Sequence, residues 1–148
     1  MNIVLLYDSY FLNTRKLAET IADVLVMQGA SVHLERFYQF DFENLEGVDL
    51  LVLGTPTHNQ GMPRPIKSVL KRLPGGTMSA VKMALFDTRY QMPARKSGSA
   101  AGRISRMLGK LGGEQLVSPQ SFFVRERRGP LVEGELERAR AWAVSLTR

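Results

Sequence analysis

Three segments of the chain combine hydroxyl, amide and aromatic side chains with turn-forming residues. They span residues 8–14, 54–63 and 87–90. The first places two hydroxyls and the amide of Asn13 at the start of a predicted helix, where free backbone N–H groups and the helix dipole favour an anion. The third ends in Tyr90, whose ring can cover a flat ligand. These residue types suit a phosphate and a flat ring. An ordinary N-cap at Asn13 and a loop anchor at Tyr90 would use the same residues.

Composition and short motifs exclude several kinds of chemistry. The chain has no cysteine, which removes disulfides, zinc–thiolate sites and cysteine nucleophiles, so redox chemistry requires a bound cofactor. His33 and His58 lie far apart without an acidic cluster at ligand spacing, which leaves a metal without a set of ligands. Neither a P-loop motif nor the GxGxxG dinucleotide fingerprint is present. A phospho-receiver domain would need an acceptor Asp where the third strand ends, and the chain has Gly54-Thr55 there.

Uninterrupted apolar runs predict the central strands of a sheet. Residues 3–7 form such a run, and residues 49–54 and 80–87 contain similar ones; continuous apolarity is typical of strands that are covered on both faces. Residues 31–37 alternate between apolar and polar, as an edge strand with one wetter face does. Residues 122–124 supply a short fifth strand. The sequence therefore predicts a sheet of five strands.

Stretches with apolar residues at helical spacing alternate with these strands or follow the last of them, and they cover residues 14–28, 66–73, 101–111 and 136–146. Alternating strands and helices imply parallel strands with right-handed crossovers, which predicts a doubly wound α/β sandwich. We expect one domain over residues 1–148, because the length is that of a single domain and no linker or repeat interrupts it. Residues 38–47 show no decisive period, and residues 88–98 form the longest predicted irregular segment. Ligands bind beyond the carboxyl ends of such strands, which brings the three polar segments together.

Basic charge is concentrated in the middle of the chain. Residues 1–63 hold three Lys and Arg against eight Asp and Glu, and residues 64–110 hold eleven against the single acid Asp87. This cluster suits an acidic partner, a phosphorylated ligand or nucleic acid, and a solvated face would have the same composition. No apolar stretch approaches the roughly 20 residues that a membrane span needs, so we expect a cytoplasmic protein.

Over nearly its whole length the chain resembles the flavodoxin family. The phosphate loop of that family reads Ser/Thr-x-Thr-Gly-Asn-Thr, and Leu12 stands here at the glycine. Residues 54–59 look like the second loop of short flavodoxin-like proteins. Residues 87–90 are similar to the third loop, whose Asp meets the pyrimidine edge of the flavin and whose Tyr stacks on the ring. The matching residues of the phosphate loop are Ser9, Asn13 and Thr14.

The resemblance implies a flavodoxin-like three-layer sandwich with strand order 2-1-3-4-5, which binds one FMN noncovalently and passes electrons one at a time. The flavin would supply the chemistry, and the protein would supply its position and electrostatics. The first loop would hold the phosphate with Arg15 as an extra cation, while His58 and Tyr90 would lie near the two faces of the ring. The implied cofactor-binding residues are Ser9, Leu12, Asn13, Thr14, Arg15, Thr55, Pro56, Thr57, His58, Asn59, Gly61, Asp87, Thr88, Arg89 and Tyr90.

Two other functions remain open at this point. A flavin-dependent NAD(P)H reductase that acts on quinones would need a second substrate pocket over the ring. A flavodoxin-fold scaffold that has lost FMN binding would account for Leu12, because glycine permits backbone angles that leucine resists. Electron carriers of this family are typically acidic, so the basic middle segment predicts an acidic redox partner rather than nucleic acid.

Overall fold

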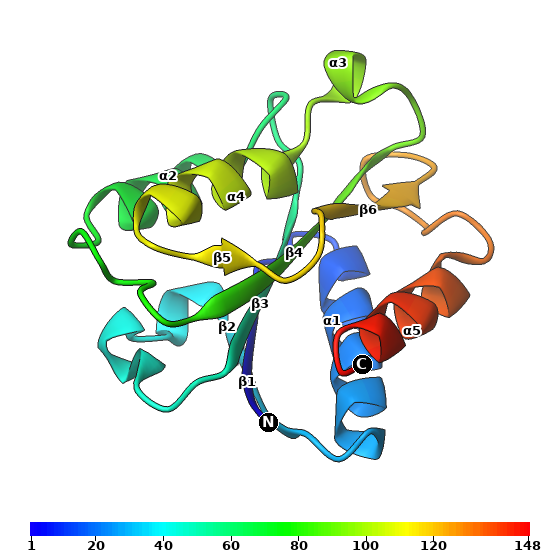
Figure 1. Cartoon of the computed structure of the whole chain (residues 1–148). Coiled ribbons are helices and arrows are strands. Elements are labelled where there is room, and N and C mark those ends of the chain that lie inside the picture. The colour runs from blue at the N-terminus through cyan, green and yellow to red at the C-terminus, as the bar shows by residue number, and fades with distance from the viewer.

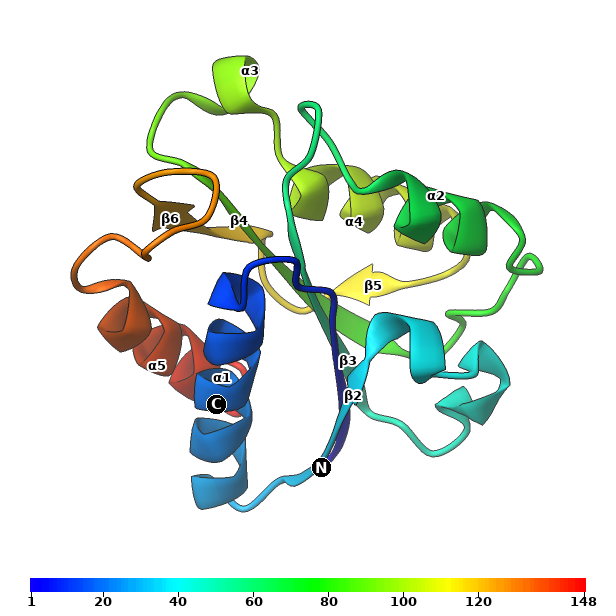
Figure 2. The same ribbon diagram turned by 180° about the vertical axis from the view of Figure 1, so that it is seen from behind.

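The computed structural model describes all 148 residues and shows a parallel sheet with helices on both faces (Figure 1, Figure 2). The strands are β1 (Asn2–Tyr7), β2 (Ser31–Arg36), β3 (Leu50–Pro56), β4 (Lys82–Tyr90), β5 (Glu114–Gln115) and β6 (Gln120–Val124). They lie in the order β2-β1-β3-β4, and both β5 and β6 pair with β4. The predicted order 2-1-3-4-5 is confirmed, with the fifth position shared by two short strands.

The fifth position is divided because β5 and β6 pair with different parts of β4. β5 pairs with Lys82 and Met83, whereas β6 pairs with the segment from Phe86 to Tyr90. Pro119 lies between the two strands, and a proline cannot donate a hydrogen bond to a strand ladder. The sequence predicted the second of these strands and missed the first, which is only two residues long.

The helices are α1 (Asn13–Met27), α2 (Arg64–Lys71), α3 (Ala94–Ser97), α4 (Ala100–Lys110) and α5 (Glu135–Ser145). α1 and α5 cover one face of the sheet, α2 and α4 cover the other, and α3 lies beyond the end of β4 (Figure 1, Figure 2). The segment without a decisive period forms two short 3₁₀ helices, η1 (Phe37–Gln39) and η2 (Phe42–Leu45). None of the helices has the length and apolarity that a membrane crossing would require.

The alternation of side chains along β1 shows how the sheet separates two cores. Ile3 and Leu5 pack with α1 and α5 on one face, whereas Val4 and Leu6 pack with α2 and α4 on the other. All four side chains are buried, and each contributes roughly 1.5–3 kcal/mol relative to an exposed position. This two-sided burial explains why the central strands are continuously apolar in sequence.

The end of β4 differs from the sequence prediction. Residues 88–98 were predicted to be irregular, but the strand continues to Tyr90 and residues 94–97 form α3. The extension exists because Thr88 and Tyr90 pair with Phe122 and Val124 of β6. Periodicity within residues 88–98 could not reveal a pairing with residues so distant in the chain. The extension carries Arg89 and Tyr90 to the rim of the sheet.

Candidate functional site

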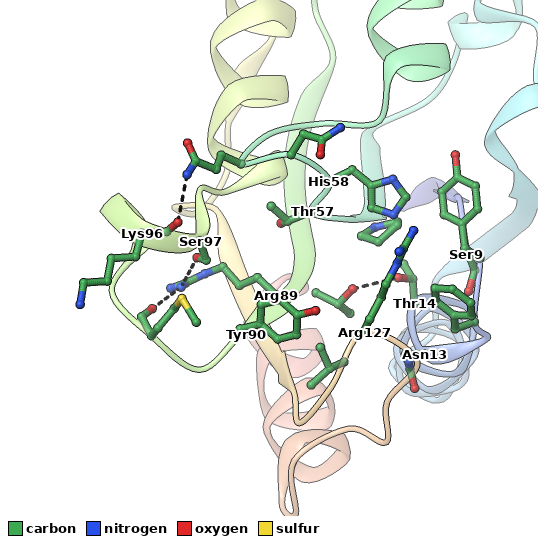
Figure 3. Close-up of a pocket in the computed structure, with 18 residues that line it drawn as sticks. Ser9, Asn13, Thr14, Thr57, His58, Arg89, Tyr90, Lys96, Ser97 and Arg127 are labelled. Carbon is green, nitrogen blue, oxygen red and sulfur yellow. Dashed lines mark hydrogen bonds between the residues drawn. The ribbon is translucent and has the colours of Figure 1, made fainter.

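A cavity of about 440 Å³ opens at the carboxyl ends of the strands (Figure 3). Its volume falls within the roughly 300–1,000 Å³ that is typical of small-molecule sites. The loops after β1, β3, β4 and β6 line it. Ten of the fifteen residues implied by the resemblance are among the lining residues: Ser9, Asn13, Thr14, Pro56, Thr57, His58, Asn59, Thr88, Arg89 and Tyr90.

The first wall of the cavity is the start of α1. Leu12 precedes the helix in the left-handed conformation, with φ 67° and ψ −7°, and its carbonyl accepts a hydrogen bond from Lys16 N at 2.9 Å. Leucine therefore takes the backbone conformation that glycine adopts most easily, at a cost of roughly 1–2 kcal/mol. No side chain caps the helix, so the backbone N–H groups of its first turn remain available beside Thr14.

The hydroxyl of Ser9 is the clearest sign of a ligand in this wall. Its oxygen is buried and has no hydrogen-bond partner. Thr14 is also buried, and its Oγ1 lies 3.4 Å from Oγ1 of Thr88. Buried polar groups in native proteins are almost always satisfied, which makes the orphaned hydroxyl at a helix N-terminus a fitting donor to a bound anion.

The loop between β6 and α5 lies against the same helix start. Asn13 Nδ2 donates a hydrogen bond to the carbonyl of Arg128 at 3.2 Å, so its side chain anchors this loop and does not cap α1. Gly129 sits so close that a Cβ there would lie 2.7 Å from Asn13 Oδ1. The guanidinium groups of Arg127 and Arg128 lie 6.0 and 5.8 Å from the ring centre of Phe11. A second, distant loop thus closes the cavity beside the start of α1.

Arg127 is the most consequential lining residue that sequence reasoning missed. Its side chain extends from the β6–α5 loop between His58 and Thr14 (Figure 3). The only signal in the sequence is the basic run at residues 125–128 before Gly129-Pro130. The other lining residues absent from the predicted set are Tyr10, Phe11, Gln60, Met92, Lys96, Ser97 and Val124.

The second loop forms a tight turn that presents His58. Backbone hydrogen bonds link His58 N to Gly61 O at 2.7 Å and Gly61 N to His58 O at 2.8 Å, while Asn59 and Gln60 adopt φ values of 47° and 66°. The His58 ring stacks on Tyr10, with ring centres 4.7 Å apart. Burial lowers the pKa of His58, and the positive charge of Arg127 lowers it further. These effects outweigh the opposing charge of Asp8 and favour the neutral imidazole.

The third loop presents Tyr90 and fixes Arg89. Tyr90 lines the cavity and is 41% exposed. Arg89 Nε donates to Ser121 Oγ at 2.9 Å, and its Nη1 donates to Met92 O at 2.6 Å and to Ser97 Oγ at 3.0 Å. Arg89 therefore ties β4 to β6 and α3, and its charge is held at the rim of the cavity.

Asp87 does not line the cavity, although the resemblance placed it at the edge of a flavin. The side chain is fully buried, and its Oδ2 accepts hydrogen bonds from Ser99 Oγ at 2.6 Å and Ala101 N at 3.0 Å. Burial raises the pKa of this carboxyl above its usual range despite these hydrogen bonds. The residue instead supports the first turn of α4.

Four further predicted residues lie outside the cavity lining. Leu12 projects into solvent and is 61% exposed. Arg15 Nε donates to Glu19 Oε1 at 2.8 Å on the surface of α1. Thr55 is completely buried, with its hydroxyl donating to the carbonyl of Pro56. Gly61 lies beneath the side chain of Arg103, outside this cavity.

The family model for flavodoxin matches residues 5–142. A flavodoxin from the domain Archaea has a TM-score of 0.79 at 16% identity, with 99% of this chain and 96% of that chain covered. Oxidised flavodoxin 1 from Bacillus cereus also gives a TM-score of 0.79 at 16% identity, over 99% of this chain and 97% of that chain.

One curated relative is a much longer protein. The S-adenosyl-L-methionine-dependent tRNA 4-demethylwyosine synthase of Oryza sativa subsp. japonica is 27% identical over 124 residues. The match covers 77% of this chain and 19% of that protein, so the chain spans about a fifth of the relative's length. The family model, in contrast, covers nearly every residue of this chain, and the strand order agrees with that of solved flavodoxins. The chain belongs to the flavodoxin family.

Proposed function

We propose that the chain binds one FMN noncovalently in this cavity and passes electrons one at a time. Membership of the flavodoxin family supports the proposal, as does the position of the cavity beyond the carboxyl ends of β1, β3 and β4. The flavin supplies the redox chemistry when it is bound. The residues of the chain bind it, orient it and set the electrostatic potential around it.

The observation that carries the proposal is the buried hydroxyl of Ser9 without a partner. An unsatisfied buried donor costs roughly 1–3 kcal/mol, and a phosphate oxygen would remove that cost by accepting its hydrogen bond. The uncapped first turn of α1 supplies backbone N–H groups for the same anion. Arg127 adds a positive charge from the β6–α5 loop. Neutral donors and a cation from separate elements suit a dianionic phosphate.

Aromatic side chains suit the ring end of the ligand. His58 stacks on Tyr10, and its lowered pKa favours the uncharged imidazole, which gives the second loop a flat surface. Tyr90 lines the cavity from β4. Stacked and edge-on aromatic contacts are worth roughly 0.5–1.5 kcal/mol beyond the burial of their area. Arg89 contributes by fixing the rim, because its donors are engaged by protein acceptors.

The test is flavin binding by the purified chain. We expect a yellow protein, or an apoprotein that quenches the fluorescence of added FMN and binds riboflavin, which lacks the phosphate, more weakly. Ser9→Ala should weaken FMN about 5- to 30-fold, which corresponds to roughly 1–2 kcal/mol. Ser31→Ala, at an exposed position on β2, is the matched control and should leave affinity unchanged.

The alternatives give different results in the same preparation. A colourless protein that ignores added FMN would contradict the proposal and indicate a scaffold without cofactor. Steady turnover of a quinone with NADPH would indicate a reductase instead of a carrier.

A further inference from the structure

A second cavity, of about 650 Å³, adjoins the proposed flavin site. Residues of α2 and α4 line it, and it shares Tyr10, His58 and Asn59 with the first cavity. We call it the basic groove, because five cationic side chains line it: Arg64, Lys67, Arg103, Arg106 and Lys110. The stacked rings of Tyr10 and His58 form the wall between the two spaces.

The charge of the basic groove is not neutralised within the molecule. No carboxylate lines the groove, and none of its five cations takes part in an ion pair. Between residues 64 and 110 the single acid is Asp87, which is buried. Five like charges along one groove repel one another, and an anionic occupant relieves that repulsion.

The cations lie in two rows. Arg103, Arg106 and Lys110 follow one another at helical spacing along α4, and Arg64 and Lys67 are one turn apart on α2. The absence of a side chain at Gly61 lets Arg103 lie across the second loop, because a Cβ there would be 2.9 Å from Arg103 Cδ. One row therefore begins at the wall that the groove shares with the flavin cavity.

The groove also offers apolar contacts. Met62 and Met107 line it together with Pro63 and Pro65. Methionine side chains are flexible and adapt to varied apolar partners. An occupant that carries carboxylates around a few apolar side chains would match both properties.

We propose that the basic groove binds an acidic segment of the protein that exchanges electrons with the flavin. This inference rests on the proposed function, because the groove matters for electron exchange only if FMN occupies the neighbouring cavity. A segment seated there lies one aromatic wall away from that cavity. Nucleic acid fits less well, because the apolar side chains of Met62 and Met107 in the groove match no part of a phosphate backbone.

Two charge-reversed variants test the proposal. The groove variant combines Arg103→Glu, Arg106→Glu and Lys110→Glu. The control variant combines Lys71→Glu, Arg72→Glu and Lys82→Glu, which change the net charge equally at exposed positions outside both cavities. The probes are a short labelled peptide rich in Glu and Leu, a Glu and Ser peptide of equal charge, and a DNA oligonucleotide of equal charge. Binding is followed by fluorescence anisotropy at about 150 mM salt, where the Debye length is about 8 Å.

We expect the Glu and Leu peptide to bind more tightly than either other probe. The groove variant should lose at least about tenfold in peptide affinity, and the control variant less than about threefold. Equal losses in the two variants, or tighter binding of the oligonucleotide, would overturn the proposal.

FMN titration of the same variants separates this inference from the proposed function. Unchanged FMN affinity in the groove variant, together with the loss of peptide binding, supports a docking site distinct from the flavin site. Failure of the wild-type chain to bind FMN while it still binds the peptide would refute electron exchange as the purpose of the groove.

Discussion

Leu12 shows that a single residue can hold a backbone conformation that its side chain disfavours. The start of α1 requires a positive φ at this position, and Leu12 provides it with the side chain in solvent. Leu12→Gly should raise the free energy of unfolding by about 0.5–1 kcal/mol, because relief of the backbone strain exceeds the entropy that glycine loses on folding. FMN affinity should change little, since the loop backbone is already in place.

Urea unfolding and FMN titration check this prediction. Leu12→Ala, which keeps the strain, should not be stabilised. A large gain in FMN affinity for Leu12→Gly would instead mean that the leucine obstructs the phosphate.

The substitution Arg127→Gln tests whether a positive charge from the β6–α5 loop contributes to binding of the FMN phosphate. Arg127→Gln removes a charge that lines the cavity, and we expect FMN to bind about tenfold more weakly while riboflavin binding is unchanged. Raising the salt concentration should reduce the difference between wild type and variant. Arg125→Gln, in the same loop but outside the lining, is the control. An equal loss for FMN and riboflavin would show that the variant perturbs the loop rather than the phosphate site.

Asp87 makes stability depend on pH in a definite direction. Burial raises its pKa, so the folded state keeps its proton to higher pH than the unfolded state does. Its contribution to stability is therefore fully present below the unfolded pKa and is lost as pH rises through the folded pKa. The free energy of unfolding of Asp87→Asn, measured relative to wild type in urea, should rise from pH 4 to pH 7. Asp23→Asn on the surface of α1 is the control, and a flat difference would contradict the assignment.

At the scale of elements, the β6–α5 loop is the part of the site that depends most on tertiary packing. Gly129 has φ 101° and lies against Asn13, whereas Gly134 has φ 89° and no neighbour within 4 Å of a Cβ. Alanine at either position should cost about 1 kcal/mol of stability through its backbone conformation. Only Gly129→Ala should also weaken FMN, because its Cβ would displace the loop that carries Arg127. Equal FMN affinities in the two variants would separate this loop from the cofactor site.

The sequence could predict the elements whose pattern is local, and not the contacts that depend on tertiary packing. The apolar runs of β1 and β3 and the stripe of α1 are local patterns that two-sided burial imposes, so they were read correctly. The roles of Asp87 and Arg127 depend on packing across long stretches of chain: Asp87 supports α4, and Arg127 reaches the cavity from a loop more than a hundred residues beyond Thr14. No periodicity encodes such contacts. The family resemblance identified the loops after β1, β3 and β4 as parts of the site. It offered no motif for the β6–α5 loop.

At the scale of the whole molecule, basic charge beside the cavity should raise the reduction potential of a bound flavin. Reduction adds negative charge, and a cation a few ångströms away is worth roughly 1 kcal/mol even at the dielectric constant of water. Arg95→Glu with Lys96→Glu reverses charges on α3, where Lys96 lines the cavity. We expect the flavin of this variant to become harder to reduce in potentiometry. The control variant Lys71→Glu with Arg72→Glu lies outside both cavities and should shift the reduction potential less. Equal shifts in the two variants would contradict an effect of the charges beside the cavity.

The parallel arrangement of the strands also determines where the N- and C-termini of the chain lie. Met1 precedes the amino end of β1, and α5 runs back toward the amino ends of the strands. Both termini therefore lie away from the cavity at the carboxyl ends (Figure 1). Tethering to an electrode or to another protein through Met1 would therefore leave the cavity and the basic groove facing outward. Site-directed immobilisation at that end should give a uniformly oriented layer, in which every molecule presents the same face to a soluble partner.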